Sequence, residues 1–256
     1  MSCRVLSLIL IVSLPTFASA LPVDLAGFGD SITCWNCNDG SYLVLLENWG
    51  YVDSAEDASH GVSGNRTHEV LTRLEDWIDA SSTADLLILL TGTPDTYQTV
   101  GGFWDRDYDP AETLSNVEAM VDLVLLEAIP LILVAPTPVL DPCAYPDELT
   151  CDVIDTRLAD LAGDLALLAS DHGVPFLDLY AAFAADPRFG LIADGGQHPG
   201  PDSLYRDDGT HPRLTTGDTL LASLLAPMIP EPSTALLLAS GLLVLAHRRA
   251  RRREEA

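Results

Sequence analysis

The sequence predicts a three-layer α/β/α sandwich with a parallel sheet of about five strands. Short apolar runs alternate along the chain with amphipathic segments that have helical spacing. A strand followed by a helix, repeated several times, is typical of a parallel sheet that carries helices on both faces. Between two distinctive terminal segments lie about 209 residues, enough for one domain with a sizeable core.

The apolar runs predict five strands in chain order. We expect them at residues 23–28, 51–58, 85–90, 131–135 and 175–179, and the second run has the weakest pattern. Helices are expected at residues 67–80, 111–127, 152–172 and 215–228. Because ligands bind at the carboxyl ends of the strands in such a sheet, the turns after the strands are the expected place for a site.

Both ends of the chain have the composition of targeting signals. Residues 1–20 combine one Arg, an apolar core of about ten residues and the triplet Ala-Ser-Ala, which is the pattern of a secretory signal cleaved before Leu21. A spanning helix would need about 20 apolar residues. Residues 230–256 contain Pro-Glu-Pro, an apolar run at 234–246 and five Arg. Arg after an apolar segment predicts a cytoplasmic tail, with residues 21–229 outside the inner membrane.

The tail resembles the PEP-CTERM sorting signal of Gram-negative bacteria. The resemblance covers about 25 residues, in which the Pro-Glu-Pro motif, the apolar run and the Arg cluster follow one another. It implies transient contact with the inner membrane through the C-terminal helix and removal of the tail by an exosortase-type enzyme. The mature protein would then reach the periplasm, the cell surface or the extracellular matrix. A permanent membrane anchor is the alternative.

The segment 21–229 is strongly acidic. Seven Arg and no Lys stand against 35 Asp and Glu, which leaves a formal net charge of −28. Such a surface repels nucleic acid and anionic lipid, so nucleic acid is not an expected partner. Solubility or adaptation to salt is the simplest role for this charge.

Four cysteines remain after the signal is removed, namely Cys34, Cys37, Cys143 and Cys151. An even number in an oxidising compartment favours disulfides. Closure of a short loop favours Cys143 with Cys151, which would leave Cys34 and Cys37 to each other. The Cys-x-x-Cys spacing also fits a thioredoxin-like motif, so a dithiol redox protein is an alternative function.

Polar motifs follow the expected strands. They read Gly-Asp-Ser-Ile-Thr at 29–33, Gly-Val-Ser-Gly-Asn-Arg-Thr at 61–67, Thr-Gly-Thr-Pro-Asp at 91–95 and Asp-Asp-Gly-Thr-His-Pro-Arg at 207–213. A serine hydroxyl becomes a good nucleophile when a histidine accepts its proton and a carboxylate orients that histidine. Asp208 and His211 lie three residues apart, so one turn can present both groups to Ser31.

In this order the motifs resemble the blocks of the GDSL or SGNH hydrolases, and the resemblance covers residues 21–229. It implies the flavodoxin-like α/β/α fold of that family and the hydrolysis of esters without a metal or cofactor. Ser31 would be the nucleophile, and Asp208 and His211 would complete the triad. The backbone N–H groups of Ser31 and Gly64 would donate to the oxyanion.

One position departs from the family pattern. The third block of the family reads Gly-x-Asn-Asp, and its asparagine donates to the oxyanion, whereas here Pro94 stands in that place. Proline has neither a side-chain donor nor a backbone N–H. Asn65 is the nearest amide in sequence and a candidate replacement. Thr91, Thr93 and Asn36 are also candidates, and the sequence does not choose among them.

The expected function is that of an exported serine esterase, with O-acetyl esters of extracellular polysaccharide as the favoured substrate. Because Pro94 removes a donor, an inactive surface or carbohydrate-binding protein of the same fold is the alternative. Residues 105–112 imitate the start of a calcium loop. Pro110 and Asn116 occupy the positions where that loop needs glycine and a bidentate acid, so no metal site is expected.

Overall fold

A computed structural model of the chain describes residues 22–37, 41–80, 82–97, 108–140, 151–190, 192–193, 198–199 and 202–230. Residues Pro22–Pro230 form one compact unit. The expected signal peptide at 1–20, the apolar and Arg-rich parts of the tail, and Cys143 lie outside the described residues. Within the described residues, no helix has the length and apolar character needed to span a membrane.

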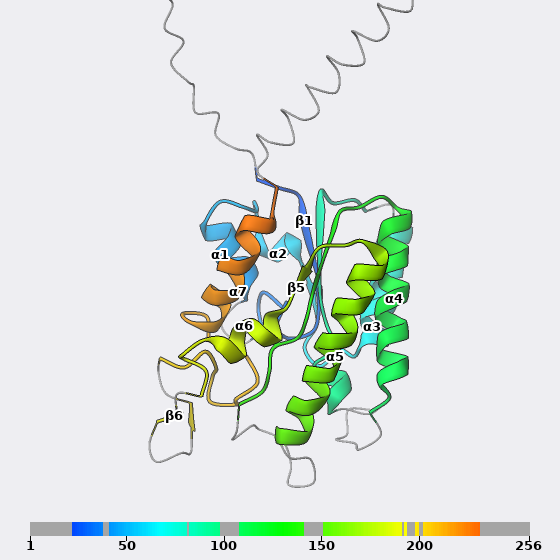
Figure 1. Cartoon of the computed structure of the whole chain (residues 1–256). Coiled ribbons are helices and arrows are strands. Elements are labelled where there is room, and N and C mark those ends of the chain that lie inside the picture. Colours follow the sequence, from blue (N-terminus) through cyan, green and yellow to red (C-terminus); the bar gives the residue numbers. More distant parts are fainter. Residues whose placement is uncertain are drawn as a thin grey trace, which may run out of the picture. The chain divides into compact units, whose positions relative to one another are not determined.

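Five parallel strands form the central sheet, in the order β2-β1-β3-β4-β5 (Figure 1). The strands are β1 (Leu25–Gly29), β2 (Ser59–Gly61), β3 (Leu86–Leu90), β4 (Leu131–Val134) and β5 (Phe176–Leu177). In the register, Gly29 pairs with Gly61 on one side and with Leu90 on the other. The last residues of three strands therefore lie level, and the loops that follow them start at the same edge.

Helices cover both faces of the sheet (Figure 1). They are α1 (Tyr42–Asn48), α2 (Ala55–Ala58), α3 (Thr67–Asp79), α4 (Pro110–Leu126), α5 (Cys151–His172), α6 (Leu179–Ala185) and α7 (Gly217–Leu225). Leu86, Ile88 and Leu90 of β3 pack with α1, α2, α6 and α7, whereas Leu87 and Leu89 pack with α3, α4 and α5. Because side chains alternate along a strand, one apolar run supplies both cores. The three-layer α/β/α sandwich is thus confirmed.

The expected second strand at residues 51–58 is wrong. Residues Ala55–Ala58 form the short helix α2, and the strand β2 begins only at Ser59. Ser54 caps this helix by accepting a hydrogen bond from the Asp57 backbone N–H at 3.2 Å. Glu47 on α1 accepts a second bond from the Ala55 N–H at 3.1 Å. These side-chain acceptors satisfy N–H groups at the helix start, which favours the helix over an extended chain.

Besides α2, four helices and strands of the described residues were not expected from the sequence. Helices α1 and α6 have seven residues each, too few for a clear helical period. The strands β6 (Ile192–Ala193) and β7 (His198–Pro199) form a two-residue antiparallel ladder. The longer elements lie close to their expected bounds, since burial of a whole face gives a long helix a strong pattern.

The carboxyl of Asp218 on α7 provides a test of the packing between α7 and the rest of the core. Burial raises the pKa of Asp218 to about 8, although the Arg206 charge and the Tyr42 backbone N–H lower it. In the unfolded chain an Asp titrates near pH 4, so between these values only the folded state holds the proton. The free energy of unfolding should therefore fall as the pH rises from about 4 to about 8.

We predict that Asp218→Asn removes this loss, because Asn has the shape of the protonated acid and cannot ionise. Relative to the wild type, the variant should gain roughly 3–5 kcal/mol between pH 5 and pH 9. Urea unfolding at both pH values measures the difference. The same substitution at the exposed Asp171 is the control, and parallel stability curves for wild type and Asp218→Asn would contradict the prediction.

Candidate active site

Ser31 lies in the turn directly after β1 and is buried to 8% exposure. The turn is closed by two hydrogen bonds to Asp30. Its backbone carbonyl accepts from the Cys34 N–H at 3.2 Å, and its carboxylate accepts from the Ile32 N–H at 3.0 Å. Glycine is required on both sides of the turn. A Cβ at Gly29 would stand 2.0 Å from the Leu90 carbonyl oxygen, and one at Gly61 would stand 2.4 Å from the Cys34 nitrogen.

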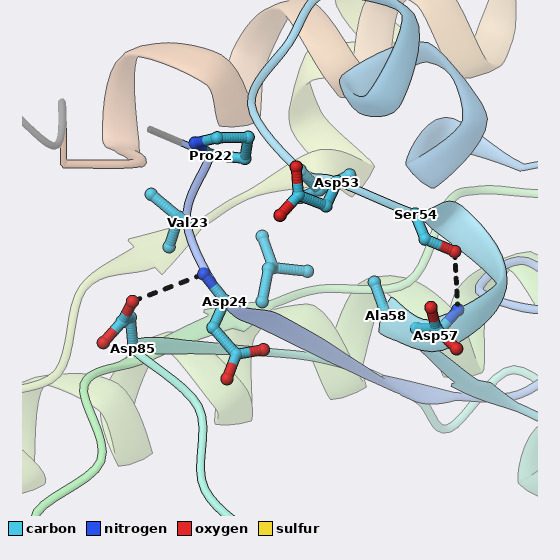
Figure 2. Close-up of a pocket in the computed structure, with 10 residues that line it drawn as sticks. Pro22, Val23, Asp24, Asp53, Ser54, Asp57, Ala58 and Asp85 are labelled. Carbon is cyan, nitrogen blue, oxygen red and sulfur yellow. Dashed lines mark hydrogen bonds between the residues drawn. The ribbon is translucent and has the colours of Figure 1, made fainter. Parts of the chain in front are cut away.

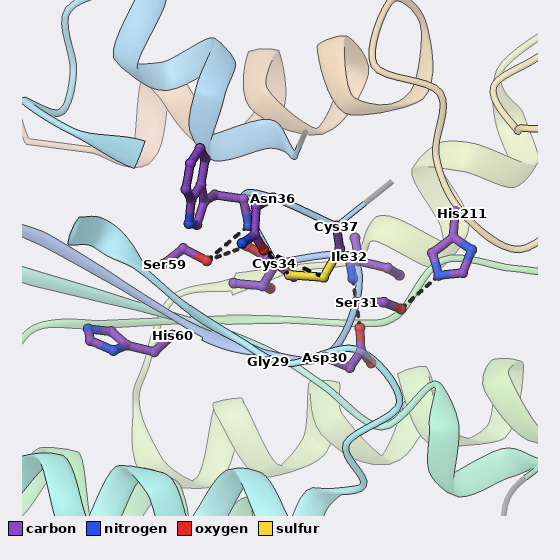
Figure 3. Close-up of a disulfide and its surroundings, with 12 residues drawn as sticks. Gly29, Asp30, Ser31, Ile32, Cys34, Asn36, Cys37, Ser59, His60 and His211 are labelled. Carbon is purple, nitrogen blue, oxygen red and sulfur yellow. Dashed lines mark hydrogen bonds between the residues drawn. A yellow bond between two sulfur atoms is a disulfide. The ribbon is translucent and has the colours of Figure 1, made fainter. Parts of the chain in front are cut away.

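The structure brings His211 and Asp208 to this serine. The His211 Nε2 lies 2.8 Å from the Ser31 Oγ, and its Nδ1 lies 2.8 Å from the Asp208 Oδ2 (Figure 3 shows the first contact). The other carboxylate oxygen of Asp208 accepts from the backbone N–H groups of Thr210 and His211, both at 2.9 Å. The Asp208 carboxylate thus stabilises the conformation of its own loop and the orientation of the His211 imidazole.

The pKa of Asp208 reflects this setting. Burial acts to raise it, but the hydrogen bonds from the His211 side chain and backbone, together with the Thr210 N–H, hold it below its usual value. Asp208 is therefore ionised at neutral pH. An ionised partner at Nδ1 keeps the proton on that nitrogen and leaves Nε2 free to accept one from Ser31.

The loop that carries Asp208 and His211 is attached to the rest of the fold through the segment after β4. The Leu140 N–H donates to the Gly209 carbonyl at 2.8 Å, and the buried Tyr205 hydroxyl donates to the Pro138 carbonyl at 2.6 Å. Gly209 has φ +66, a conformation that favours glycine. Strand β4 thereby helps to position a histidine that is 180 residues from the nucleophile in sequence.

The second loop follows β2 and contains Gly64 and Asn65. Gly64 has φ +76, where a side chain would be strained. The loop begins beside β1, since the Val62 N–H donates to the Gly29 carbonyl at 3.2 Å, and it turns at the bond from the Asn65 N–H to the Val62 carbonyl, also 3.2 Å. The Asn65 side-chain oxygen accepts a hydrogen bond from Arg73 on α3.

The third loop follows β3 and holds Pro94 as the buried first residue of a short 3₁₀ turn (Pro94–Thr96). The next residue, Asp95, is buried at 2% exposure and joins this loop to the second one. Its carboxylate accepts from the Thr67 N–H at 2.9 Å and from the Thr67 hydroxyl at 2.6 Å. Asn116 on α4 donates to the same hydroxyl at 3.1 Å. Burial raises the pKa of Asp95, and these hydrogen bonds oppose the rise.

The alternative amide and hydroxyl donors have different surroundings. Asn36 is exposed and lies beside the sulfur atoms of Cys34 and Cys37 (Figure 3). Thr91 and Thr93 are buried, and their hydroxyls find no hydrogen-bond partner among the described residues. Buried hydroxyls without a partner are uncommon, so both stay candidates beside Asn65 for a donor.

Asp30 is a residue that the sequence reasoning missed. It is 1% exposed, and one oxygen of its carboxylate has no hydrogen-bond partner within the part of the chain that is described. Burial raises the pKa of Asp30 to about 6, against the hydrogen bond from Ile32 and the nearby His211. The signal in the sequence was an acid directly before the nucleophile in an otherwise apolar strand end.

A disulfide joins Cys34 and Cys37, as expected (Figure 3). Cys151 is also disulfide-bonded. The first disulfide belongs to the turn that carries Ser31, and Ser59 attaches this turn to β2. The Ser59 hydroxyl donates to the Thr33 carbonyl at 3.0 Å and accepts from the Trp35 N–H at 3.1 Å. Because Cys34 is only 5% exposed, these contacts favour a structural role over thiol exchange.

No group of three or more His, Cys, Asp or Glu among the described residues could hold a metal ion. In the segment that imitates a calcium loop, Asp109 caps α4 by accepting from the N–H groups of Ala111 and Glu112. A cavity of about 320 Å³ lies at the other end of the sheet, before β1 and β3 (Figure 2). Asp24, Asp53, Asp57 and Asp85 line it. No histidine is among its lining residues, and Ser54, which also lines it, caps α2.

Solved structures with this fold are similar over most of the chain. An acetyl xylan esterase shares 19% identity at a TM-score of 0.60, covering 80% of this chain and 99% of that chain. A lipase/acylhydrolase from Enterococcus faecalis shares 23% at 0.56, covering 80% and 94%. An acetylxylan esterase from Geobacillus stearothermophilus shares 18% at 0.56, covering 80% and 93%. Identities this low show the shared fold.

The sequence comparisons identify the family. No curated protein sequence is significantly similar to this chain. The profile of the GDSL-like lipase/acylhydrolase family matches residues 28–212, which span all four loops described above and well over half of the chain. The chain therefore belongs to the GDSL-like lipase/acylhydrolase family and is a hydrolase that acts on esters.

Proposed function

We propose that this hydrolase is an exported serine esterase in which Ser31 is the nucleophile, His211 the general base and Asp208 the residue that orients the base. The observation that carries the proposal is the continuous path of 2.8 Å contacts from Ser31 Oγ through His211 to Asp208. Residues far apart in sequence supply this path, at the edge of the sheet where such folds bind ligands.

The reaction proceeds in two halves. His211 Nε2 takes the proton of Ser31 Oγ as that oxygen attacks the ester carbon, and it then gives the proton to the departing alcohol. The acyl group is left on Ser31. His211 next takes a proton from water, whose oxygen attacks the acyl carbon, and the proton returns to Ser31 Oγ as the carboxylic acid leaves. Asp208 stays ionised throughout, since its pKa is lowered.

The negative oxygen formed in each half needs donors. The N–H groups of Ser31 and Gly64 are two of them, and the side-chain amide of Asn65 is the third, in place of the asparagine that Pro94 has replaced. Asn65 is preferred over the threonines because its amide oxygen is already occupied by Arg73, which leaves the NH₂ group to donate.

The proposed substrates are small carboxylic esters, with O-acetyl groups of extracellular polysaccharide first among them. Two similar structures are described as acetyl xylan or acetylxylan esterases, which makes acetylated sugars a reasonable first choice. A net charge of −28 over residues 21–229 would disfavour anionic polymers. Release of acetate from acetylated polysaccharide tests this choice directly.

Export to the periplasm or cell surface is part of the proposal. A disulfide in the nucleophile turn suits an oxidising compartment. The terminal signals expected from the sequence would provide the route, with an exosortase-type enzyme as the processing partner.

A surface or carbohydrate-binding protein without turnover is the second candidate, and Pro94 is the observation that favours it. Loss of one oxyanion donor typically lowers kcat by about 10²- to 10³-fold. If nothing replaces the donor, the same fold could bind an acetylated sugar and release it unchanged.

Variants of the three central residues test the esterase. With p-nitrophenyl acetate, Ser31→Ala and His211→Ala should each lower kcat by about 10⁴-fold or more, while Asp208→Asn leaves a small residual rate. Ser223→Ala and His172→Gln, on exposed or remote positions of α7 and α5, are the matched controls. Undiminished turnover by a folded Ser31→Ala protein would refute the triad.

A second set of variants identifies the third oxyanion donor. Asn65→Ala should lower kcat by about 10²- to 10³-fold with little change in thermal stability, since it removes a donor that acts on the transition state. In the protein that keeps Asn65, Pro94→Asn should change kcat little, because Asn65 already fills the position of the donor. Thr93→Val is the matched variant of the rival donor, and a loss confined to Thr93→Val would assign the role to that hydroxyl.

The mature ends are a separate prediction. Protein extracted from the cell surface should lack the first 20 residues and the segment after about Pro232. Intact-mass spectrometry decides this directly. A mass that still includes the Arg-rich tail would contradict removal by a sorting enzyme and would favour a permanent anchor.

A further inference from the structure

We infer that Arg73 is a positioning residue that holds the Asn65 side-chain amide in the orientation needed to donate to the oxyanion. The inference rests on the proposed function, in which Asn65 replaces the donor lost at Pro94. Arg73 lies on α3, and its hydrogen bonds among the described residues go to Asn65, Glu69, Gly29 and His60. None of them goes to Ser31, His211 or Asp208. Its effect on the reaction would therefore pass through Asn65.

The chemistry of the guanidinium determines how the amide is turned. Arg73 Nη1 donates to the Asn65 side chain, and a guanidinium has no acceptor atom, so the partner must be the amide oxygen. The Asn65 NH₂ group therefore points away from Arg73. It donates to none of the residues that the structure describes, so it is free to meet a negative oxygen.

Two backbone carbonyls hold the guanidinium in place. Arg73 Nη2 donates to the Gly29 carbonyl at 2.8 Å and to the His60 carbonyl at 3.0 Å. These belong to β1 and β2, and Gly29 is two residues before Ser31. Because the guanidinium is planar and its N–H groups have fixed directions, anchoring one nitrogen on the sheet sets the direction of the other. Through Arg73, the orientation of the Asn65 amide is thus tied to β1, the strand that leads into Ser31.

A positive charge behind the amide also improves its donor strength. A hydrogen bond accepted by the Asn65 oxygen polarises the amide and makes its N–H groups more positive. The guanidinium is half-buried, so solvent screens this effect only in part. A lysine at the same position would keep the charge but, with a single nitrogen, could not hold both carbonyls and the amide in the same geometry.

The surroundings allow Arg73 to be replaced without loss of the core. It borders an open cavity of about 340 Å³, together with Phe28, Ser59, His60, Gly61, Val62 and Asp76. The side chain is therefore not packed on all sides, and Arg73→Lys is expected to fold.

A double-mutant cycle in the full chain tests the inference. With p-nitrophenyl acetate, Arg73→Lys should lower kcat by about 10- to 100-fold, with KM changed less than about threefold, because a misdirected donor loses part of its effect on the transition state. In the Asn65→Ala background the same change should lower kcat less than about threefold. Arg188→Lys, at an arginine paired with Asp186 at 2.7 Å, is the control.

The possible outcomes distinguish failure of the Arg73 inference from failure of the Asn65 donor and from failure of the esterase function. Equal losses in both backgrounds would mean that Arg73 acts through the sheet carbonyls, which overturns the inference and leaves the esterase intact. An Asn65→Ala protein with unchanged kcat would remove Asn65 as the donor, and the inference with it. A wild type without turnover on any ester would refute the proposed function instead.

A measurement that does not need turnover completes the test. The side-chain NH₂ resonances of Asn65, assigned by their loss in Asn65→Ala, should shift and exchange faster with water in Arg73→Lys, and less so in Arg188→Lys. Unchanged resonances would overturn the inference even for an inactive protein. Should Arg73→Lys not fold, Arg73→Met, which keeps an unbranched side chain but has no donor for the Asn65 oxygen, takes its place in both experiments.

Discussion

The level alignment of three parallel strands is the constraint on which the rest of the site depends. Gly29 of β1 pairs with Gly61 of β2 and with Leu90 of β3, so three loops leave the sheet at one height. The alignment requires glycine, because a Cβ at Gly29 would stand 2.0 Å from the Leu90 carbonyl oxygen and one at Gly61 would meet the backbone of the nucleophile turn. Any side chain there would push the turn away from its neighbours, and the serine with it.

The side chains of Asp95 and Arg73 then hold these loops together. The Asp95 carboxylate accepts hydrogen bonds from Thr67, which joins the third loop to the start of α3. The Arg73 guanidinium donates to the ends of β1 and β2 and to the second loop. Both are partly or fully withdrawn from solvent, and each makes several hydrogen bonds that offset the cost of burial. Helix α3 takes part in both contacts and couples the second loop to its two neighbours.

Pro94 stands where the family pattern has an asparagine, and it fits the local backbone of this edge. Proline suits the first position of the short 3₁₀ turn, since its fixed φ matches that turn and its missing N–H is not needed there. The neighbouring Asp95 keeps its contacts with Thr67. The third loop thus keeps its contact with the start of α3 without an amide side chain at position 94, and in the proposed reaction the third donor comes from the loop beside it.

The sequence by itself determined the layers and pointed to the candidate site residues. Short apolar runs that alternate with amphipathic helical segments favour buried parallel strands, and the spacing of Asp208 and His211 lets one turn present both. It failed for β2 and did not reveal α1 or α6, because short elements owe their form to caps and neighbours rather than to a period. Only the tertiary structure decided which polar groups meet. Arg73 finds Gly29 across 44 residues and Thr67 finds Asp95 across 28. Such pairings arise because burial obliges distant polar groups to satisfy one another, and no local pattern records the partner.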